Sequence, residues 1–451
     1  MCFALTRVPF FKGNEKEIHT GMIHDNLNPE ASLAWQYMMK KKKHQKLFLV
    51  GVVAWALLSF IFFFQSTDSN LIFFRASVVS TSALGNKRPI DAPRVENKAS
   101  TEQPKQKDRR RSRAIIPPVM QQNSSLDESW VDKVVRGLWM GWASSDMLSS
   151  DLRKAKKDYT AINLYRVTYT GYWKKQRDKK NLLCQLKQHK LLRTLTGSEE
   201  PFVSLGWQKL VPRQPLEEAI SGPYRTCAVV SSAGAILNSS LGREIDSHDA
   251  VLRFNAAPTE GYENDVGSKT TIRVINSQIM ADPQHRFADS HLYKNITLVA
   301  WDPGPYSGNL EKWYKSPDHD LFTAYIEHRK RSPSQHFYIL HPGFLWNLWD
   351  ILQSNTEENV HPNPPSSGFI GIILMMSICK NLDVYEFIPS KRHTTLCHYY
   401  EQYHDFACTL GAYHPLFYEK LLIRRMSTVS LDELKTKGKV TLPGFSQIKC
   451  T

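Results

Sequence analysis

The sequence predicts an α/β domain with a largely parallel sheet, carried behind one membrane anchor and a stem. Three observations lead to this prediction. A single apolar stretch is long enough to cross a bilayer, and beyond about Trp130 short β-branched or aromatic runs alternate with helix-length segments. The composition is globular, with 41% hydrophobic and 11% aromatic residues. A chain of 451 residues with this composition is not collagen-like, fully disordered or a multi-span membrane protein.

The predicted anchor is the segment 47–64, LFLVGVVAWALLSFIFFF, which is uncharged and about as short as a spanning helix can be. A lysine cluster at 40–46 precedes it, and no basic residue follows directly after it. The positive-inside rule then predicts a cytoplasmic tail over 1–46 and a lumenal remainder. A cleaved signal peptide is the alternative, but the run is long and far from the first residue. Met22 is an alternative start, and the short span favours a thin Golgi-type membrane.

Residues 65–129 are rich in Ser, Lys, Arg, Pro and Gln without sustained periodicity, which is typical of an extended stem. The run DRRRSR at 108–113 resembles a nucleic-acid patch, but the predicted topology places it where no nucleic acid is expected. We interpret it as a solvated charge run. A sharper hypothesis is that a secretory-pathway convertase cleaves after Arg113 and releases the lumenal domain. The net charge of +15 by itself indicates only solubility and non-specific binding.

Cysteine usage agrees with a lumenal domain. Six of the seven cysteines lie beyond the anchor, and an even set in an oxidising compartment predicts disulfides that the spacing alone cannot pair. These six are Cys184, Cys227, Cys379, Cys397, Cys408 and Cys450. Cys2 remains on the cytosolic side. Asn123, Asn238 and Asn295 each begin an N-x-Ser/Thr acceptor and are expected glycosylation sites.

The lumenal domain is expected over 130–451, without an internal repeat. Its strand candidates are Thr226 to Ser231, Ala250 to Asn255, Thr270 to Asn276, Ile296 to Trp301, His336 to His341 and Leu382 to Ile388. Helical patterns such as Gly343 to Gln353 and Gly368 to Cys379 separate them. Strands that alternate with helices predict a parallel sheet, whose ligand cleft opens at the carboxyl ends of the strands.

The first candidate site is CAVVSSAG at 227–234, a buried strand that runs into a turn of small residues and then a helix-length stretch. Small residues let backbone N–H groups approach a phosphate, and a helix N-terminus favours an anion. The pattern is not GxGxxG, and an ordinary strand and turn explain it equally. Asn255 and Asn276 end two further strands, where their amides can donate to and accept from a ligand or simply terminate the strand.

The second candidate is HPNPPSSG at 361–368, followed by the apolar run FIGIILMMSIC. Ser366 or Ser367 can cap the helix, and unpaired N–H groups would then face a nearby anion. A capped core helix explains the same residues. Because a helix this apolar must be buried, we expect its N-terminus at the edge of a cleft.

The third candidate is AYHPLFYEK at 412–420, in which Glu419 follows His414 by five residues. Histidine is the usual general base for a hydroxyl, although a lone histidine is more often structural. Nucleophilic catalysis is disfavoured, because there is no GxSxG and all lumenal cysteines can pair.

Two metal sites were considered as weaker hypotheses. Asp318-His319-Asp320 has the D-x-D form with which many sugar-nucleotide transferases hold Mn²⁺. His398, Glu401 and His404 would share one face of a helix. Both patterns are short and common, and solvated surface is the alternative.

With these segments in order, the chain resembles the animal sialyltransferases, most closely the β-galactoside α-2,6-sialyltransferases of type 1 or type 2. The resemblance covers roughly Arg166 to Cys450 and the layout of tail, anchor and stem. The stretch 227–278 is similar to the family's long donor motif and 361–387 to its short motif. HYYE at 398–401 is similar to the third motif, and His414 to Glu419 fits the very short H-x4-E motif.

The resemblance implies a variant Rossmann-like (GT-A-like) glycosyltransferase fold that uses CMP-sialic acid without a metal or other cofactor. It implies a Golgi membrane location, with galactose-terminated N-glycans as acceptors. The implied donor-binding residues are Ser232, Asn255, Asn276, Ser366, Ser367, Gly368, His398, Thr409, Tyr413 and Lys420. The implied acceptor-binding residues are Gln278, Asp318 and Tyr413. Close relatives often have tyrosine where this chain has His398 and His319.

The resemblance also implies a mechanism and a disulfide pattern. His414 would take the proton from the galactose 6-hydroxyl as it attacks the anomeric carbon of sialic acid, with inversion. The implied pairs are Cys184 with Cys450, Cys227 with Cys379, and Cys397 with Cys408.

Three alternatives stay open. A catalytically silent glycan-binding protein is disfavoured because His414 and all four motifs are intact. Transfer in an α-2,3 linkage or to N-acetylgalactosamine is disfavoured by YEFIPSKR and the late PGF. Nucleic-acid binding is a distant third. Paralogue type, preferred acceptor, oligomeric state and glycan occupancy are not decided by the sequence.

Overall fold

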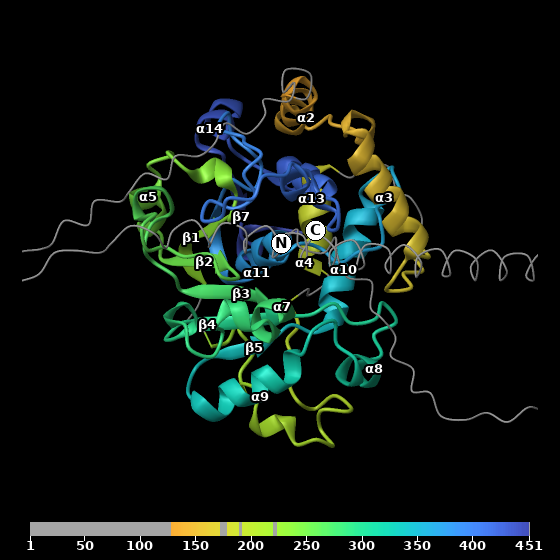
Figure 1. Cartoon of the computed structure of the whole chain (residues 1–451), viewed down its shortest axis with the longest axis vertical. Coiled ribbons are helices and arrows are strands. Elements are labelled where there is room, and N and C mark those ends of the chain that lie inside the picture. The colour runs from red at the N-terminus through yellow and green to blue at the C-terminus, as the bar shows by residue number, and fades with distance from the viewer. Residues whose placement is uncertain (1–127, 172–177, 189–191, 220–222, 451) are drawn as a thin grey trace, which may run out of the picture. The chain divides into compact units, whose positions relative to one another are not determined.

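The computed structural model describes residues 128–171, 178–188, 192–219 and 223–450 (Figure 1). Its longer helices are α2 (Glu128–Met140), α3 (Ser150–Ile162), α4 (Lys179–Gln188), α9 (Leu321–Arg331), α10 (Pro342–Ser354), α11 (Ser367–Ile378) and α13 (Leu416–Met426). Shorter ones are α5 (Gly242–Asp246), α6 (Glu263–Val266), α7 (Ser277–Ala281), α8 (Leu310–Lys315), α12 (Ala407–Leu410) and α14 (Leu431–Lys437). The strands are β1 (Tyr224–Val230), β2 (Ala250–Phe254), β3 (Ile272–Asn276), β4 (Thr297–Trp301), β5 (Phe337–Ile339), β6 (Cys379–Tyr385) and β7 (Lys439–Pro443).

The strands form one 7-stranded sheet in the order β5-β4-β3-β2-β1-β6-β7. Strands β1 to β6 pair in parallel, and β7 pairs antiparallel with β6. The chain therefore builds the sheet outward from β1 to β5 and then returns through α10 and α11 to place β6 on the other side of β1. This reversal between β1 and β6 is the topological switch point of the sheet.

The predicted α/β class and largely parallel sheet are confirmed. Each of the six predicted strands overlaps an observed strand, with ends that differ by up to three residues. The largest shift is at β6, which begins at Cys379, directly after α11, whereas Leu382 was expected. None of the predicted strands corresponds to β7.

Side chains from both faces of the sheet are buried, as expected for parallel strands covered by helices. Alternate residues of β1 illustrate this, because Cys227 and Val229 join the cluster that contains α11, whereas Ala228 and Val230 pack with α5. The second face is completed near β3 to β5 by a separate cluster that includes residues of α7, α8 and α9.

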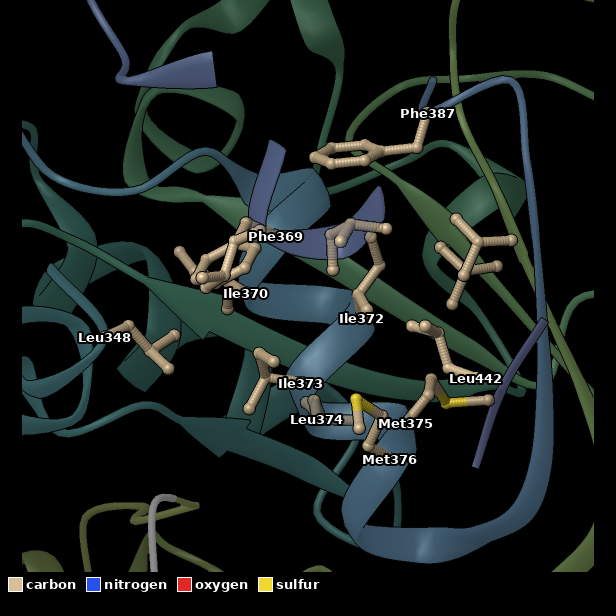
Figure 2. Packing of buried hydrophobic residues seen from close by; sticks show 14 of the residues in the cluster. Leu348, Phe369, Ile370, Ile372, Ile373, Leu374, Met375, Met376, Phe387 and Leu442 are labelled. Carbon is tan, nitrogen blue, oxygen red and sulfur yellow. The ribbon is translucent and has the colours of Figure 1, made fainter. Parts of the chain in front are cut away.

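Helix α11 is the central helix of the first face. Phe369, Ile370, Ile372, Ile373 and the residues that follow extend from it in all directions into the core (Figure 2), and they are fully buried. Because the helix is apolar on every side, burial rather than amphipathicity fixes its place. Gly371 permits close packing, since a Cβ there would lie 2.6 Å from Cε1 of Phe254 on β2.

Three disulfides are present in the described domain: Cys184–Cys450, Cys227–Cys379 and Cys397–Cys408. They join the same pairs that the resemblance implies. Cys227 of β1 and Cys379 at the start of β6 link the two neighbouring strands of the switch point.

The predicted tail (1–46), the anchor (47–64) and the stem up to residue 127 lie outside the described residues, as do Cys2, Met22, Arg113 and Asn123. Within the described ranges, no helix combines the length and apolarity needed to span a bilayer. The expected glycosylation sites Asn238 and Asn295 both lie exposed on the surface.

Candidate active site

A cleft lies at the carboxyl ends of β1, β2 and β6, next to the switch point. Its walls come from the turn after β1 (231–235), the end of β2, the start of α11 and the segment 386–389 after β6. The loop 393–398 and the segment 405–420 close the other side. The cleft is therefore in the position where open α/β sheets bind ligands.

The turn after β1 contributes Ser231, Ser232 and Gly234 to the cleft. A side chain at Gly234 would not fit, because a Cβ would lie 2.5 Å from the carbonyl oxygen of Leu396. The prediction of a helix-length segment directly after this turn is wrong. Only a single 3₁₀ turn, Gly234–Ile236, follows, because Leu237 is already extended. This segment offers a close backbone approach but no long helix behind it.

Asn255 and Asn276 are adjacent at the ends of β2 and β3. The N–H of Asn276 donates to Oδ1 of Asn255 at 3.2 Å, and Asn255 has a left-handed φ of 48°. Arg273, which is buried, holds this bend by donating to the carbonyls of Asn255 and Ala257 at 2.8 and 3.0 Å. Asn255 lines the cleft, whereas Asn276 does not.

The start of α11 opens into the cleft through Ser366, Ser367 and Gly368. Ser366 is the N-cap, since its Oγ accepts from the N–H of Phe369 at 3.1 Å. The buried carboxylate of Glu419 accepts from both the N–H and the Oγ of Ser366, at 2.8 and 2.5 Å. Burial raises the pKa of Glu419 to about 7, against the effect of the Ser366 hydrogen bonds.

His414 lies in the cleft wall with its Nδ1 2.8 Å from the carbonyl oxygen of Pro364. A carbonyl can only accept, so Nδ1 carries the proton and the neutral ring keeps Nε2 as its proton acceptor. Burial lowers the pKa of His414 to about 4, against the effect of the Pro364 hydrogen bond. This is the tautomer and charge state that a general base needs.

The segments 361–367 and 413–419 are bound together along their length. The ring Nε2 of His361 and the amide of Asn363 both donate to the carbonyl of Tyr413, at 2.8 and 2.9 Å. The bonds from His414 to Pro364 and from Ser366 to Glu419 continue this pairing. Glu419 thus supports the helix start. The His414 ring binds the carbonyl of Pro364, so the histidine and the glutamate of H-x4-E have separate partners.

Lys420, Thr409 and His398 also line the cleft. The Nζ of Lys420 donates to the carbonyl of Phe387 and lies 4.5 Å from the centre of its ring, and burial lowers the pKa of Lys420 to about 8. His398 stacks on Tyr400 with ring centres 5.4 Å apart, and its Nδ1 is 2.7 Å from the carboxylate of Glu401.

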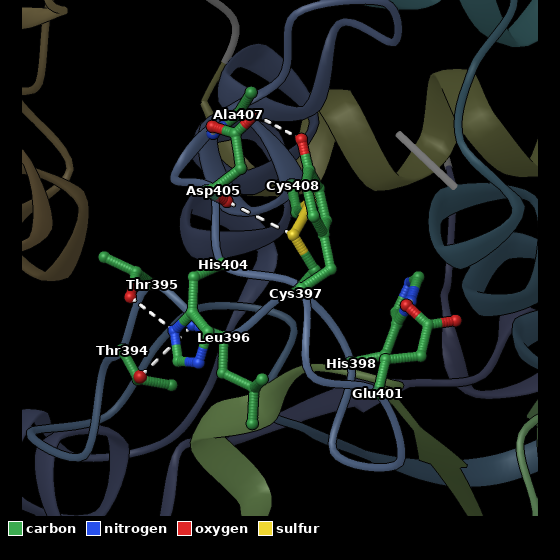
Figure 3. Close-up of a disulfide and its surroundings, with 11 residues drawn as sticks. Thr394, Thr395, Leu396, Cys397, His398, Glu401, His404, Asp405, Ala407 and Cys408 are labelled. Carbon is green, nitrogen blue, oxygen red and sulfur yellow. Dashed lines mark hydrogen bonds and ion pairs between the residues drawn. A yellow bond between two sulfur atoms is a disulfide. The ribbon is translucent and has the colours of Figure 1, made fainter. Parts of the chain in front are cut away.

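The histidine and carboxylate groups considered as metal ligands do not form a cluster. His398 and Glu401 form their own pair, whereas His404 bonds to Thr395 at 2.8 Å (Figure 3). The segment is a series of turns rather than a helix, so the expected shared helical face is wrong. Asp320 caps α9 through the N–H of Thr323. Within the described ranges, no three His, Cys, Asp or Glu residues are grouped as a metal site.

Of the predicted acceptor residues, Tyr413 lines the cleft, whereas Gln278 and Asp318 do not. The hydroxyl of Tyr165 donates to the Asp318 carboxylate at 3.2 Å and lies 2.6 Å from the Tyr413 hydroxyl. Asp318 is exposed, and Gln278 lies half-buried on α7. Although its side chain is reached by solvent, the surrounding protein atoms desolvate the Asp318 carboxylate, and this desolvation, with the charge of Asp302, raises its pKa.

Sequence reasoning missed several residues of the cleft wall. Val131 and Val135 come from α2 and Tyr159 from α3, and the ring of Tyr159 meets that of Tyr413 edge-on at 5.5 Å. None of these positions belongs to a recognisable motif, and helical periodicity marks them only as core residues. Asp302, which lies outside the cleft wall, could have been singled out from the sequence, because this polar residue directly follows a buried strand, as Asn255 does.

Residues 172–430 match the model of glycosyltransferase family 29 (sialyltransferase). The chain is 62% identical over 317 residues to beta-galactoside alpha-2,6-sialyltransferase 2 of Danio rerio, which covers 70% of this chain and 62% of that protein. It is 56% identical over 346 residues to the Homo sapiens protein of the same name, covering 77% and 65%. The chain thus spans somewhat less than two thirds of the length of these two relatives.

Among solved structures, a match to a crystal structure of a mammalian sialyltransferase covers 61% of this chain and 81% of that one. The sequence identity is 23% and the TM-score is 0.33.

Proposed function

The chain belongs to glycosyltransferase family 29, the sialyltransferases, and on this premise we propose that it transfers sialic acid from CMP-sialic acid to the 6-hydroxyl of terminal galactose. The proposed acceptor is Galβ1-4GlcNAc on glycoprotein glycans. The names of the Danio rerio and Homo sapiens relatives support the α-2,6 linkage and favour type 2 over type 1. The observation that carries the proposal is a neutral histidine and a capped helix start in one cleft at the switch point.

The donor is proposed to bind along the cleft floor. Ser232 and Asn255 lie at strand ends where they can contact the CMP group, and Ser366, Ser367 and Gly368 present the start of α11. The N–H groups of a helix start favour an anion, so this end suits the charged groups of the donor. His398, Thr409 and Lys420 complete the donor side, and Asn276 supports it through Asn255.

The proposed reaction is a single inverting displacement. Nε2 of His414 takes the proton of the galactose 6-hydroxyl while that oxygen attacks the anomeric carbon of sialic acid. The bond from that carbon to the CMP phosphate breaks, and CMP leaves with the electron pair. The product is α-linked because the donor is β-linked. A general base of this kind typically contributes a factor of about 10² to 10⁴ in rate.

The departing phosphate is proposed to be stabilised by protein groups without a metal ion. The helix start, the serine hydroxyls and Lys420 supply donors and positive charge where negative charge develops. Gln278, Asp318 and Tyr413 are proposed to hold the galactose, with Tyr165 fixing the last two relative to each other.

The cellular setting is also a proposal. The apolar segment 47–64 with its preceding lysines supports a type II anchor in the Golgi membrane and a lumenal catalytic domain. Cleavage of the stem would give a secreted form. The three disulfides agree with an oxidising compartment.

The test is transfer from CMP-sialic acid to N-acetyllactosamine by the purified full chain in detergent, in excess EDTA, with the product linkage read by NMR. We expect an α-2,6 product at an undiminished rate. An α-2,3 product, or transfer only to N-acetylgalactosamine, would replace the proposed acceptor chemistry. Binding of CMP without any product would support the silent glycan-binding alternative.

A further inference from the structure

Asp302 is a fully buried carboxylate directly after β4, and it is not among the residues that line the cleft. No ion pair to it is present among the described residues. A buried charge is costly unless hydrogen bonds satisfy it, so its surroundings should show what it holds.

Four donors from three segments converge on this carboxylate. The Ser277 hydroxyl donates to Oδ1, and the indole N–H of Trp313 donates to Oδ2 at 2.7 Å. The backbone N–H groups of Asp318 and His319 donate to Oδ2 and Oδ1 at 3.2 and 3.4 Å. Both oxygens are therefore used twice, which matches an ionised carboxylate.

The segments that Asp302 binds carry the proposed acceptor residues. Ser277 begins α7 and directly precedes Gln278, and the two backbone N–H groups belong to the loop that carries Asp318. The parallel register of β3 and β4 explains the contact between Ser277 and Asp302. Asn276 pairs with Trp301 at the ends of these strands, and Ser277 and Asp302 are the residues that follow them.

The residue before Asp302 faces the donor side. The indole N–H of Trp301 donates to Oγ of Ser367 at 2.9 Å, and the Trp301 ring lies 6.2 Å from the ring of His414. The end of β4 thus contacts the helix start through one residue and the acceptor segments through the next.

We propose that Asp302 is a positioning residue that fixes the loop of Asp318 relative to Gln278, and so sets the affinity for the acceptor sugar without contacting it. The inference rests on the proposed function. Loss of the carboxylate should release the loop, while the donor cleft, which Asp302 does not line, stays formed.

The experiment is to measure KM for N-acetyllactosamine, KM for CMP-sialic acid and kcat for the full chain and for Asp302→Asn, together with CMP binding by calorimetry. Hydrogen bonds to a buried charge are worth enough to predict an increase in acceptor KM of about tenfold or more. CMP affinity should stay within about twofold of the wild type. Asp383→Asn is the matched control, because it also removes the charge of a hydrogen-bonded aspartate. Asp383 lies on β6 and bonds to His248 and to Thr441 of β7, on the other side of the sheet from β3 and β4.

An unchanged acceptor KM would overturn the proposal. An increase in acceptor KM matched by an equal loss of CMP affinity would also overturn it, since this result indicates that the donor cleft is disturbed as much as the acceptor segments. If Asp302→Asn does not fold, Ser277→Ala and Trp313→Phe each remove one donor and should raise acceptor KM in the same direction by less. No change in either would overturn the proposal equally. Failure of the wild type to use N-acetyllactosamine would instead count against the proposed function.

Discussion

His414 is held in one tautomer by the carbonyl of Pro364, and burial keeps the ring neutral. If it is the base, His414→Ala should lower kcat by about 10² to 10⁴ while CMP affinity changes little, because the substitution removes proton transfer but not the helix start. Initial rates and calorimetry measure the two effects separately. A kcat within a few-fold of the wild type would remove His414 from this role.

The lowered pKa of His414 predicts the acid side of the pH profile. The base must be unprotonated, so the rate should fall as pH falls through the folded-state pKa of about 4 rather than through the usual value near 6.5. Glu419, whose pKa of about 7 lies inside the range, is replaced by glutamine for this measurement, and we then expect kcat at saturating substrates to stay nearly constant from pH 7.5 down to about 5.5. At saturating acceptor, kcat does not depend on acceptor affinity, so titration of the proposed acceptor residue Asp318 should not affect it. A half-maximum near pH 6.5 would contradict the prediction.

Individual site residues were predictable where a motif marked them. Ten residues implied by the resemblance, including His414, Ser366 and Lys420, do lie in one cleft. Tyr159, which reaches the cleft from α3, and Tyr165, which contacts the Tyr413 hydroxyl from the segment after α3, were not predictable, because an isolated tyrosine carries no local signal. The sequence assigned no contact to Glu419, and in the fold its carboxylate binds Ser366.

At the level of elements, Glu419 joins α13 to the start of α11. Glu419→Gln should lose at least one hydrogen bond to Ser366, with a loss of stability of about 1 to 3 kcal/mol and a weaker CMP affinity. Thermal unfolding and calorimetry check both effects. The control is Glu433→Gln, which loses a partly exposed ion pair with Lys439 and should cost about 0 to 1 kcal/mol. Equal effects of the two substitutions would contradict the assigned role.

The elements themselves follow from patterns of burial. The mostly apolar runs of β1 to β4 can be read as buried parallel strands, and α11 is apolar on all sides. Strand β7, KVTLP, alternates between buried and partly exposed residues, but it was missed because it has only five residues and ends in proline. The order of the strands in the sheet also depends on tertiary packing, so the alternation predicts a parallel sheet but not the place of β6.

At the level of the whole molecule, the disulfides constrain loops of very different length. Cys227–Cys379 spans 152 residues and Cys397–Cys408 spans 11. The chain-entropy model predicts that replacing the first pair by alanine costs about 5 kcal/mol and the second about 3 kcal/mol. Thermal unfolding under non-reducing conditions should show this order. Cys397 and Cys408 line the cleft, so loss of their disulfide should also weaken CMP binding directly. For the same decrease in Tm, CMP affinity should therefore fall further than after loss of Cys227–Cys379. The reverse order of Tm would contradict the entropic account.

The bond between Cys184 and Cys450 has a different consequence. It joins residues 266 positions apart, so the domain from α4 onward forms one covalently closed ring. A protease that cuts the backbone once anywhere inside this ring leaves both fragments attached to each other. Nicked molecules would therefore migrate on a non-reducing gel with the intact enzyme, and only thiol treatment would reveal them as two bands.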